Sequence, residues 1–225
     1  MNSWIKKQIK KKSFLLVLLF LISVLRITSG EWKIPFSEVI KFLLRPDSSP
    51  QSIIIRSVRL PRILSAMGTG GLLSAAGVVL QALLANPLAE PYTLGIASGA
   101  AFGASLAIMA GLAVTPFSFF GALFALLMTG IISRGGGEKL ILAGVISNSI
   151  LSAGVTFIKS IAGDKLGAVV LWLMGSISGA GINDVYLISA GIILVLPAAF
   201  MFAPALDAMS LGKDRAAVLG INENS

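Results

Sequence analysis

Apolar residues fill long stretches of this chain, and short polar or proline-containing segments separate one stretch from the next. The stretches cover residues 13–29, 61–84, 91–111, 113–132, 139–161 and 186–205. Their lengths approach the roughly twenty residues that an α-helix needs to cross the hydrocarbon core of a bilayer. A helix satisfies its own peptide groups, which lipid cannot do. The pattern therefore predicts an all-α fold, a polytopic transmembrane helical bundle.

The composition supports the same fold class. Hydrophobic residues make up 56% of the chain, charged residues 12%, and the mean hydropathy is +0.91. A soluble domain of this size carries far more charge on its surface. Histidine and cysteine are both absent, which removes the commonest metal ligand, the usual general base and all thiol chemistry. We therefore expect no cofactor, no metal site and no enzymatic activity.

The net charge of +8 owes much to a lysine cluster before the first apolar stretch: Lys6, Lys7, Lys10, Lys11 and Lys12. A cluster beside an apolar run is typical of contact with anionic membrane lipid and of a cytoplasmic amino terminus, so no nucleic-acid partner is needed. The same lysines, followed by Phe14–Leu25 and small residues at 28–30, also imitate a secretory signal peptide.

An uncleaved first helix fixes the sides of the connections. The outer ones are then 30–60, 112–115 and 162–185, and the inner ones are 85–90, 133–138 and 206–225. The first outer connection contains Trp32 and several prolines, and we expect a short interfacial helix in it over Phe36–Leu44.

Arg59 and Arg62 flank Pro61 at the start of the second stretch. Proline suits the first position of a helix, so Arg62 would lie in the first turn. The helix dipole disfavours a cation there, and an anion on a partner protein would offset that cost. Snorkelling of two long basic side chains at the membrane interface is the alternative explanation.

Glycines recur every four residues in the third stretch. Gly95, Gly99 and Gly103 continue to Ala107 and Gly111 as one smooth face that a second helix can approach closely. The glycines of the second stretch, at 68–77, predict a similarly smooth surface for close helix packing. The Gly-Thr-Gly-Gly run at 68–71 is no dinucleotide fingerprint, because no strand precedes it.

Two further segments could line a transport pathway. The proline-bounded turn 86–91 offers Asn86 and Leu88 as gate residues, although a stiff helix connector explains the turn equally well. In the fifth stretch, Asn148, Ser152 and Thr156 share one helical face with Lys159. Polar groups in a membrane helix face either a cavity or another helix, and both roles stay open here.

Several motifs in a fixed order carry a family resemblance. They are Arg-Leu-Pro-Arg at 59–62, a glycine-laced helix ending at Gln81, Asn-Pro-Leu-Ala-Glu-Pro at 86–91, Trp-x-x-Gly-Ser at 172–176 and Leu-Asp-Ala-Met-Ser-Leu-Gly-Lys-Asp-Arg-Ala-Ala-Val-Leu-Gly at 206–220. Together they closely resemble the FecCD family, the iron-siderophore, heme and vitamin B12 class of ABC-transporter permeases. The resemblance also favours the uncleaved first helix.

The resemblance implies the permease subunit of an ABC importer in a bacterial cell membrane. Its implied partners are cytoplasmic ATPase subunits, an extracytoplasmic substrate-binding protein that docks on Arg59 and Arg62, and a second permease subunit. Ferric siderophore is the commonest cargo of the class, with heme and cobalamin still open. Coupling to the ATPase is implied for residues of 206–220, namely Ser210, Leu211, Gly212, Ala216, Ala217 and Gly220.

The chemical groups that the sequence lacks agree with an energy source on another subunit. No carboxylate pair lies in the middle of a predicted span, as proton-coupled transport usually needs, and no P-loop sequence is present. The resemblance implies about six helices of a roughly ten-helix family fold, so residues 1–225 would form one carboxy-terminally truncated permease domain. The alternative is a non-transporting membrane interaction or receptor protein, or an inactive permease fragment.

Overall fold

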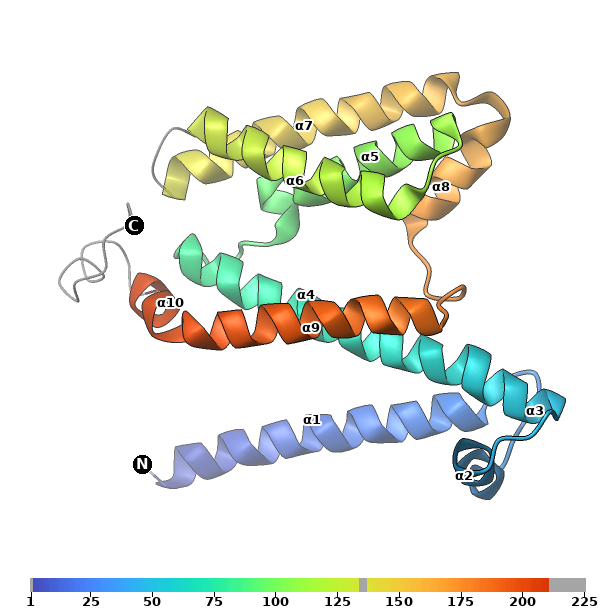
Figure 1. Ribbon diagram of the computed structural model, residues 1–225. Helices are drawn as coiled ribbons and strands as arrows, with labels where there is room; N and C mark the ends of the chain where they lie inside the picture. The colour runs from blue at the N-terminus through green and yellow to red at the C-terminus, as the bar shows by residue number, and fades with distance from the viewer. Residues whose placement is uncertain (1, 134–136, 211–225) are drawn as a thin grey trace. The chain divides into compact units, whose positions relative to one another are not determined.

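The computed structural model describes residues 2–133 and 137–210, and every regular element in them is helical (Figure 1). The α-helices are α1 (Asn2–Thr28), α2 (Phe36–Leu44), α3 (Pro50–Ile53), α4 (Leu60–Leu83), α5 (Ile96–Ala110), α6 (Val114–Ser133), α7 (Gly137–Ile161), α8 (Leu166–Met174), α9 (Ile182–Met201) and α10 (Ala203–Ser210). Three other helical segments join them: η1 (Ile54–Arg59), η2 (Pro91–Leu94) and η3 (Gly163–Lys165). The helical fold class and the short helix over Phe36–Leu44 are confirmed.

Within the described residues, four helices are long and apolar enough to cross a membrane: Pro50–Leu83, Val114–Ser133, Lys139–Ile161 and Ile182–Met201. Helix α5 is shorter, and α1 carries its lysines at the amino-terminal end. Most large apolar side chains of these helices are exposed, such as Phe119 at 65% and Ile193 at 70%. Exposed apolar faces of this kind suit a lipid environment, which satisfies them as water cannot.

The prediction that a helix begins at Pro61 is wrong, because the helical stretch already begins at Pro50. Pro61 lacks an N–H, and in a regular α-helix its ring would clash with the carbonyl four residues earlier. The preceding segment η1 is a π-helix, and the Leu60 N–H bonds to the Ile55 carbonyl, five residues back. This wider turn relieves the conflict. Arg62 therefore does not lie in a first helical turn, and the dipole argument for it fails.

The third stretch also begins later than predicted, because the α-helix starts at Ile96 and not at residue 91. Residues Pro91–Leu94 form a 3₁₀ turn closed by a capping box between Glu90 and Thr93. Gly95 then adopts a left-handed conformation, with φ of 73°, which glycine reaches without steric cost. The chain changes direction there before α5 begins.

The described chain divides into two compact units. The described residues of Met1–Gly71 and Ile177–Ile193 form the first unit, and those of Leu72–Ser176 and Leu194–Ser225 form the second. The first has a small core where the apolar face of α2 meets α1 and η1, made of Ile27, Ile34, Val39, Phe42 and Ile55. In the second unit, α5, α6 and α7 pack side by side (Figure 1).

Candidate functional site

Backbones of α5 and α6 approach each other unusually closely in the second unit. A Cβ atom added at Gly103 would lie 3.0 Å from the carbonyl carbon of Phe117 and 3.2 Å from the Cα of Gly121. A Cβ atom at Gly99 would lie 2.5 Å from the Cβ of Ala125. Ala107 on the same face is fully buried. Small residues therefore set the distance between these two helices.

The other predicted glycines have different roles. Gly95 faces α7, where an added Cβ would lie 3.2 Å from the backbone nitrogen of Asn148. Gly111 ends α5 with φ of 71°, and a Cβ there would meet no described atom within 4 Å, so its predicted place in the packing face is wrong. In the second stretch, Gly68 meets Ile188 of α9, whereas Cβ atoms at 70, 71 and 77 would enter open space among the described residues.

Gly144 of α7 is a close contact that sequence reasoning missed. An added Cβ would lie 2.9 Å from the Leu94 Cα and would also meet the Thr93 carbonyl oxygen. Beside it, the buried Thr129 hydroxyl donates to the Leu94 carbonyl at 3.0 Å and lies 2.9 Å from the Ser147 hydroxyl. These contacts hold η2 against α6 and α7. The signal in the sequence is weak, since one glycine in an apolar helix has many explanations.

The polar face of α7 lines a groove of about 350 Å³ in the second unit. Its lining includes the predicted residues Asn148, Ser152 and Thr156, together with Lys159. Ser152 and Thr156 are exposed, whereas Asn148 and Lys159 are half-buried. The structure therefore brings these residues together on one open surface. In the described chain, Ser152 and Thr156 make no interhelical hydrogen bond, because their hydrogen-bond partners lie on α7 itself.

Aromatic residues from two other elements complete this groove. Tyr92 comes from η2, and Trp172 comes from α8. Helix α8 was not predicted, because nine residues are too few to cross a membrane. The Lys165 ammonium donates to the Met109 carbonyl at 2.7 Å and ties the start of α8 to the end of α5. None of the described residues that line the groove is acidic, so Lys159 gives it a positive charge.

The predicted gate residues lie in a tight turn after α4. The Asn86 side chain accepts a hydrogen bond from the Leu88 backbone at 2.9 Å, an Asx turn that fixes the local backbone. Leu88 is 82% exposed. Asn86 also lines a cavity of about 630 Å³ in the second unit, and Ser210 at the end of α10 lines the same cavity. The other predicted coupling residues, Leu211, Gly212, Ala216, Ala217 and Gly220, lie outside the described residues.

Arg59 and Arg62 lie in the first unit and both bind backbone carbonyls. The Arg59 guanidinium donates to Ile27 at 2.7 Å and to Trp32 at 2.5 Å, across the end of α1. Arg62 donates to the Ser178 carbonyl. Each guanidinium has five N–H donors, so neither is saturated by these bonds.

Comparison with known proteins identifies the family. The sequence profile of the FecCD transport family matches residues 15–225. This chain belongs to the FecCD transport family. FecCD membership makes it a multi-pass membrane protein of a transport family and not an enzyme.

Relatives of this FecCD chain include archaeal and bacterial permeases. It is 33% identical over 96% of its length to MJ0087 of Methanocaldococcus jannaschii, named as an ABC transporter permease protein, and spans 68% of that protein. It is 31% identical over 92% of its length to the ferric enterobactin permease protein FepD of Escherichia coli and spans 65% of FepD. A relative in Helicobacter pylori, named for iron chelatin transport, is spanned over 57% of its length.

A solved structure shares the fold of this FecCD chain. It is described as a metal-chelate type ABC transporter in an inward-facing conformation, with a TM-score of 0.82 and 30% identity. The match covers 96% of this chain and 69% of that one.

Proposed function

We propose that this chain is the transmembrane permease subunit of an ABC importer that carries a ferric siderophore, or a related iron, heme or cobalamin chelate, across the cytoplasmic membrane of a bacterial or archaeal cell. FecCD membership supports a transport function. The polar groove on α7 supports the proposal that cargo passes along this helix. Asn148, Ser152 and Thr156 have exposed or half-buried polar atoms there. Such groups in membrane helices mark transport paths.

The chemistry of the groove suits a bulky chelate with negative charge. Hydroxyl and amide groups bind chelate oxygens, the rings of Tyr92 and Trp172 offer flat apolar surface, and Lys159 attracts an anion. Named relatives carry different chelates, among them ferric enterobactin, iron(III) citrate and cobalamin. We therefore propose the cargo class and not one compound.

The partners in this proposal supply what the chain lacks. A cytoplasmic pair of ATPase subunits supplies energy, because the sequence has no P-loop. An extracytoplasmic binding protein delivers the chelate, and a second permease subunit completes the pathway. Asn86 and Leu88 are proposed to constrict its inner end. Ser210 lines the same cavity as Asn86, which supports a mechanical link between this turn and the proposed coupling segment.

Docking of the binding protein is proposed at Arg59 and Arg62. We expect Arg62→Glu to weaken binding-protein affinity about tenfold at low salt and less at high salt, because exposed charge pairs are screened. Arg59→Glu is the weaker test, since it also removes two hydrogen bonds at the end of α1. Affinity measured by surface plasmon resonance checks this, with Lys33→Glu as a charge-matched external control. Unchanged affinity in a folded Arg62→Glu protein excludes the docking role.

The segment 206–220 is proposed to dock on the ATPase. Small residues such as Ala216 and Ala217 would allow close approach to a partner's groove. We expect Ala217→Arg to reduce ATPase co-purification about tenfold, because a long charged side chain would hold the two surfaces apart. Gly220→Val is expected to act similarly where the backbone takes a positive φ. Co-purification and coupled ATP hydrolysis are the readouts, with Asn224→Arg as control. Wild-type values of both in Ala217→Arg rule out this contact.

A further inference from the structure

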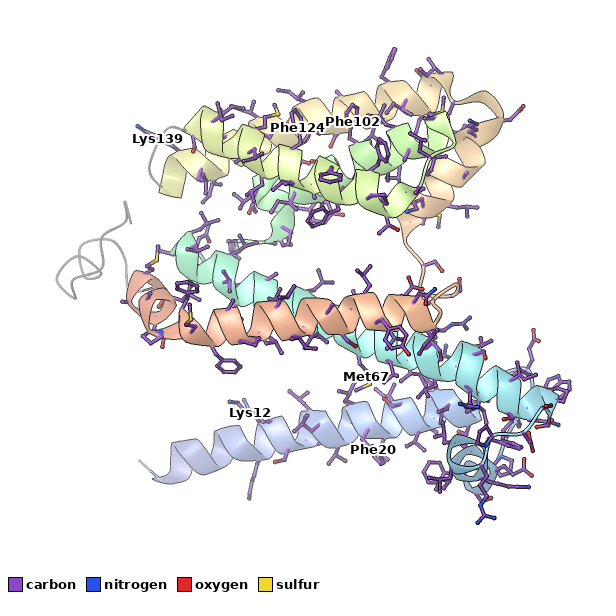
Figure 2. All side chains as sticks on the ribbon, viewed as in Figure 1. Lys12, Phe20, Met67, Phe102, Phe124 and Lys139 are labelled. Carbon is purple, nitrogen blue, oxygen red and sulfur yellow. The ribbon has the colours of Figure 1, made fainter. Side chains whose placement is uncertain are left out.

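A cavity of about 670 Å³ lies along the carboxy-terminal half of α1 and the beginning of α4, wholly within the first unit. Its wall is apolar over most of its length, with Leu19 and Ile22 from α1 and Ile63 and Met67 from α4. Met67 lies between the two helices (Figure 2), and its sulfur is 3.7 Å from the Ser23 hydroxyl. The transport proposal gives a docking role to Arg59 and Arg62 at one end of this cavity and no role to its apolar part.

One end of the cavity is strongly cationic. Arg26, Arg59 and Arg62 all line it, against a single acidic residue among the described ones, Glu31. Within the described residues, Arg59 and Arg62 bind only neutral carbonyls, so their charges are not cancelled there. The Nε atom of Arg62 is buried and has no hydrogen-bond partner. Arg26 is exposed and has no hydrogen bond or ion pair within the described chain. An unpaired buried donor is costly, so this end favours an anionic ligand.

The dimensions and the order of the lining residues also restrict the ligand. From Arg26 back to Leu19, α1 rises about 10 Å, at roughly 1.5 Å per residue. Arg26 lies in the last turn of α1, and Trp32 also lines the cationic end, where aromatic residues mark a membrane–water interface. A ligand that fills this cavity thus has an anionic group at the interface and a hydrocarbon chain directed toward the membrane interior. A free inorganic anion would leave the apolar wall uncovered.

We infer that this cavity binds an anionic phospholipid, with its phosphate between Arg26 and Arg62 and one acyl chain along α1 and α4. Arg59 keeps its bonds to the end of α1 and adds positive charge nearby. The bound lipid brings a negative charge beside the guanidinium groups of Arg26 and Arg62 and covers the apolar wall. It thereby fills a space that the first unit's own side chains leave open.

Fluorescence quenching tests this site in the full chain. Trp4→Phe and Trp172→Phe leave Trp32, at the cavity, as the single tryptophan of the three. The purified protein in neutral detergent is titrated with phosphatidylglycerol or phosphatidylcholine that carry the same brominated acyl chains. We expect phosphatidylglycerol to quench Trp32 at a mole fraction at least about fivefold lower, given about 1 kcal/mol for each basic residue near an anionic lipid.

Variants connect the quenching to the arginines. Arg26→Gln is expected to remove most of the preference for phosphatidylglycerol, and Arg62→Gln to do the same where it folds, whereas the exposed Lys139→Gln keeps it. Equal quenching by the two lipids overturns the proposal, and so does a preference that survives in Arg26→Gln. No quenching by either lipid would contradict the lipid-binding proposal. It would indicate that another protein segment or a second copy of the chain fills the cavity. Displacement of the lipid by millimolar inorganic phosphate also overturns it, because the site would then be one for a soluble anion.

Discussion

Leucine in place of Gly103 is expected to prevent the second unit from folding. The nearest neighbours of a new Cβ would be backbone atoms of α6, at Phe117 and Gly121, which cannot move aside as a flexible side chain can. Overpacking of a soluble core costs about 1–3 kcal/mol, and a leucine pressed against backbone lies at or above the top of that range. The two helices must separate to accept it, and Gly99 would then lose its own close contact with Gly121 and Ala125 of α6.

The measurement is the yield of monodisperse protein in detergent, together with the midpoint of thermal unfolding. Gly130→Leu is the matched control, because it makes the same change in the interior of α6 where an added Cβ would meet no described atom within 4 Å. Gly103→Ala should fall between wild type and leucine. Equal yields and equal midpoints for Gly103→Leu and Gly130→Leu would refute the close approach of α5 and α6.

Reversal of the groove's charge should strongly reduce uptake of an anionic chelate. Lys159 is half-buried among the hydroxyl, amide and aromatic groups of the groove, and no acidic residue lines it among those described. Two unit charges about 4 Å apart interact with about 4 kcal/mol at an effective dielectric of about 20. With solvent screening, we expect Lys159→Glu to lower the uptake rate of a ferric siderophore at least about tenfold.

Lys139→Glu controls for the change in net charge, because Lys139 is an exposed residue near the other end of the same helix (Figure 2). Lys159→Gln should give an intermediate rate. A neutral cargo would be much less sensitive to these changes, so the comparison also separates charged from neutral chelates. Wild-type uptake of an anionic chelate by folded Lys159→Glu protein would remove the groove from the transport path.

Hydropathy alone predicted the long apolar helices, because bilayer thickness fixes the length of a spanning helix and leaves a strong signal. The π-helical turn before Pro61 could not be predicted in this way. It depends on how the backbone accommodates a missing N–H, and both solutions, a helix start and a wider turn, fit the same residues. The start of α5 at Ile96 is a similar case, since the apolar run continues unbroken through Gly95.

The candidate site was predicted in part. A four-residue spacing places Asn148, Ser152 and Thr156 on one face of α7, because helical geometry is local. Tyr92 and Trp172 join them only through tertiary packing, which brings η2 and α8 to α7 and leaves no periodic signal in the sequence. The hydrogen bonds of Arg59 could not be predicted for the same reason, because its carbonyl partners at Ile27 and Trp32 lie about thirty residues earlier in the chain.

The most direct test of the transport proposal is ATP-dependent uptake of radioactive iron, as its siderophore complex, into liposomes. The liposomes contain this permease with its cognate ATPase subunits, and the binding protein is added outside. The proposal predicts uptake that requires ATP, the binding protein and this permease together, and that falls in Lys159→Glu. Assembly of all three proteins with ATP hydrolysis but without uptake of any ferric siderophore, heme or cobalamin would contradict it and would favour a non-transporting membrane protein.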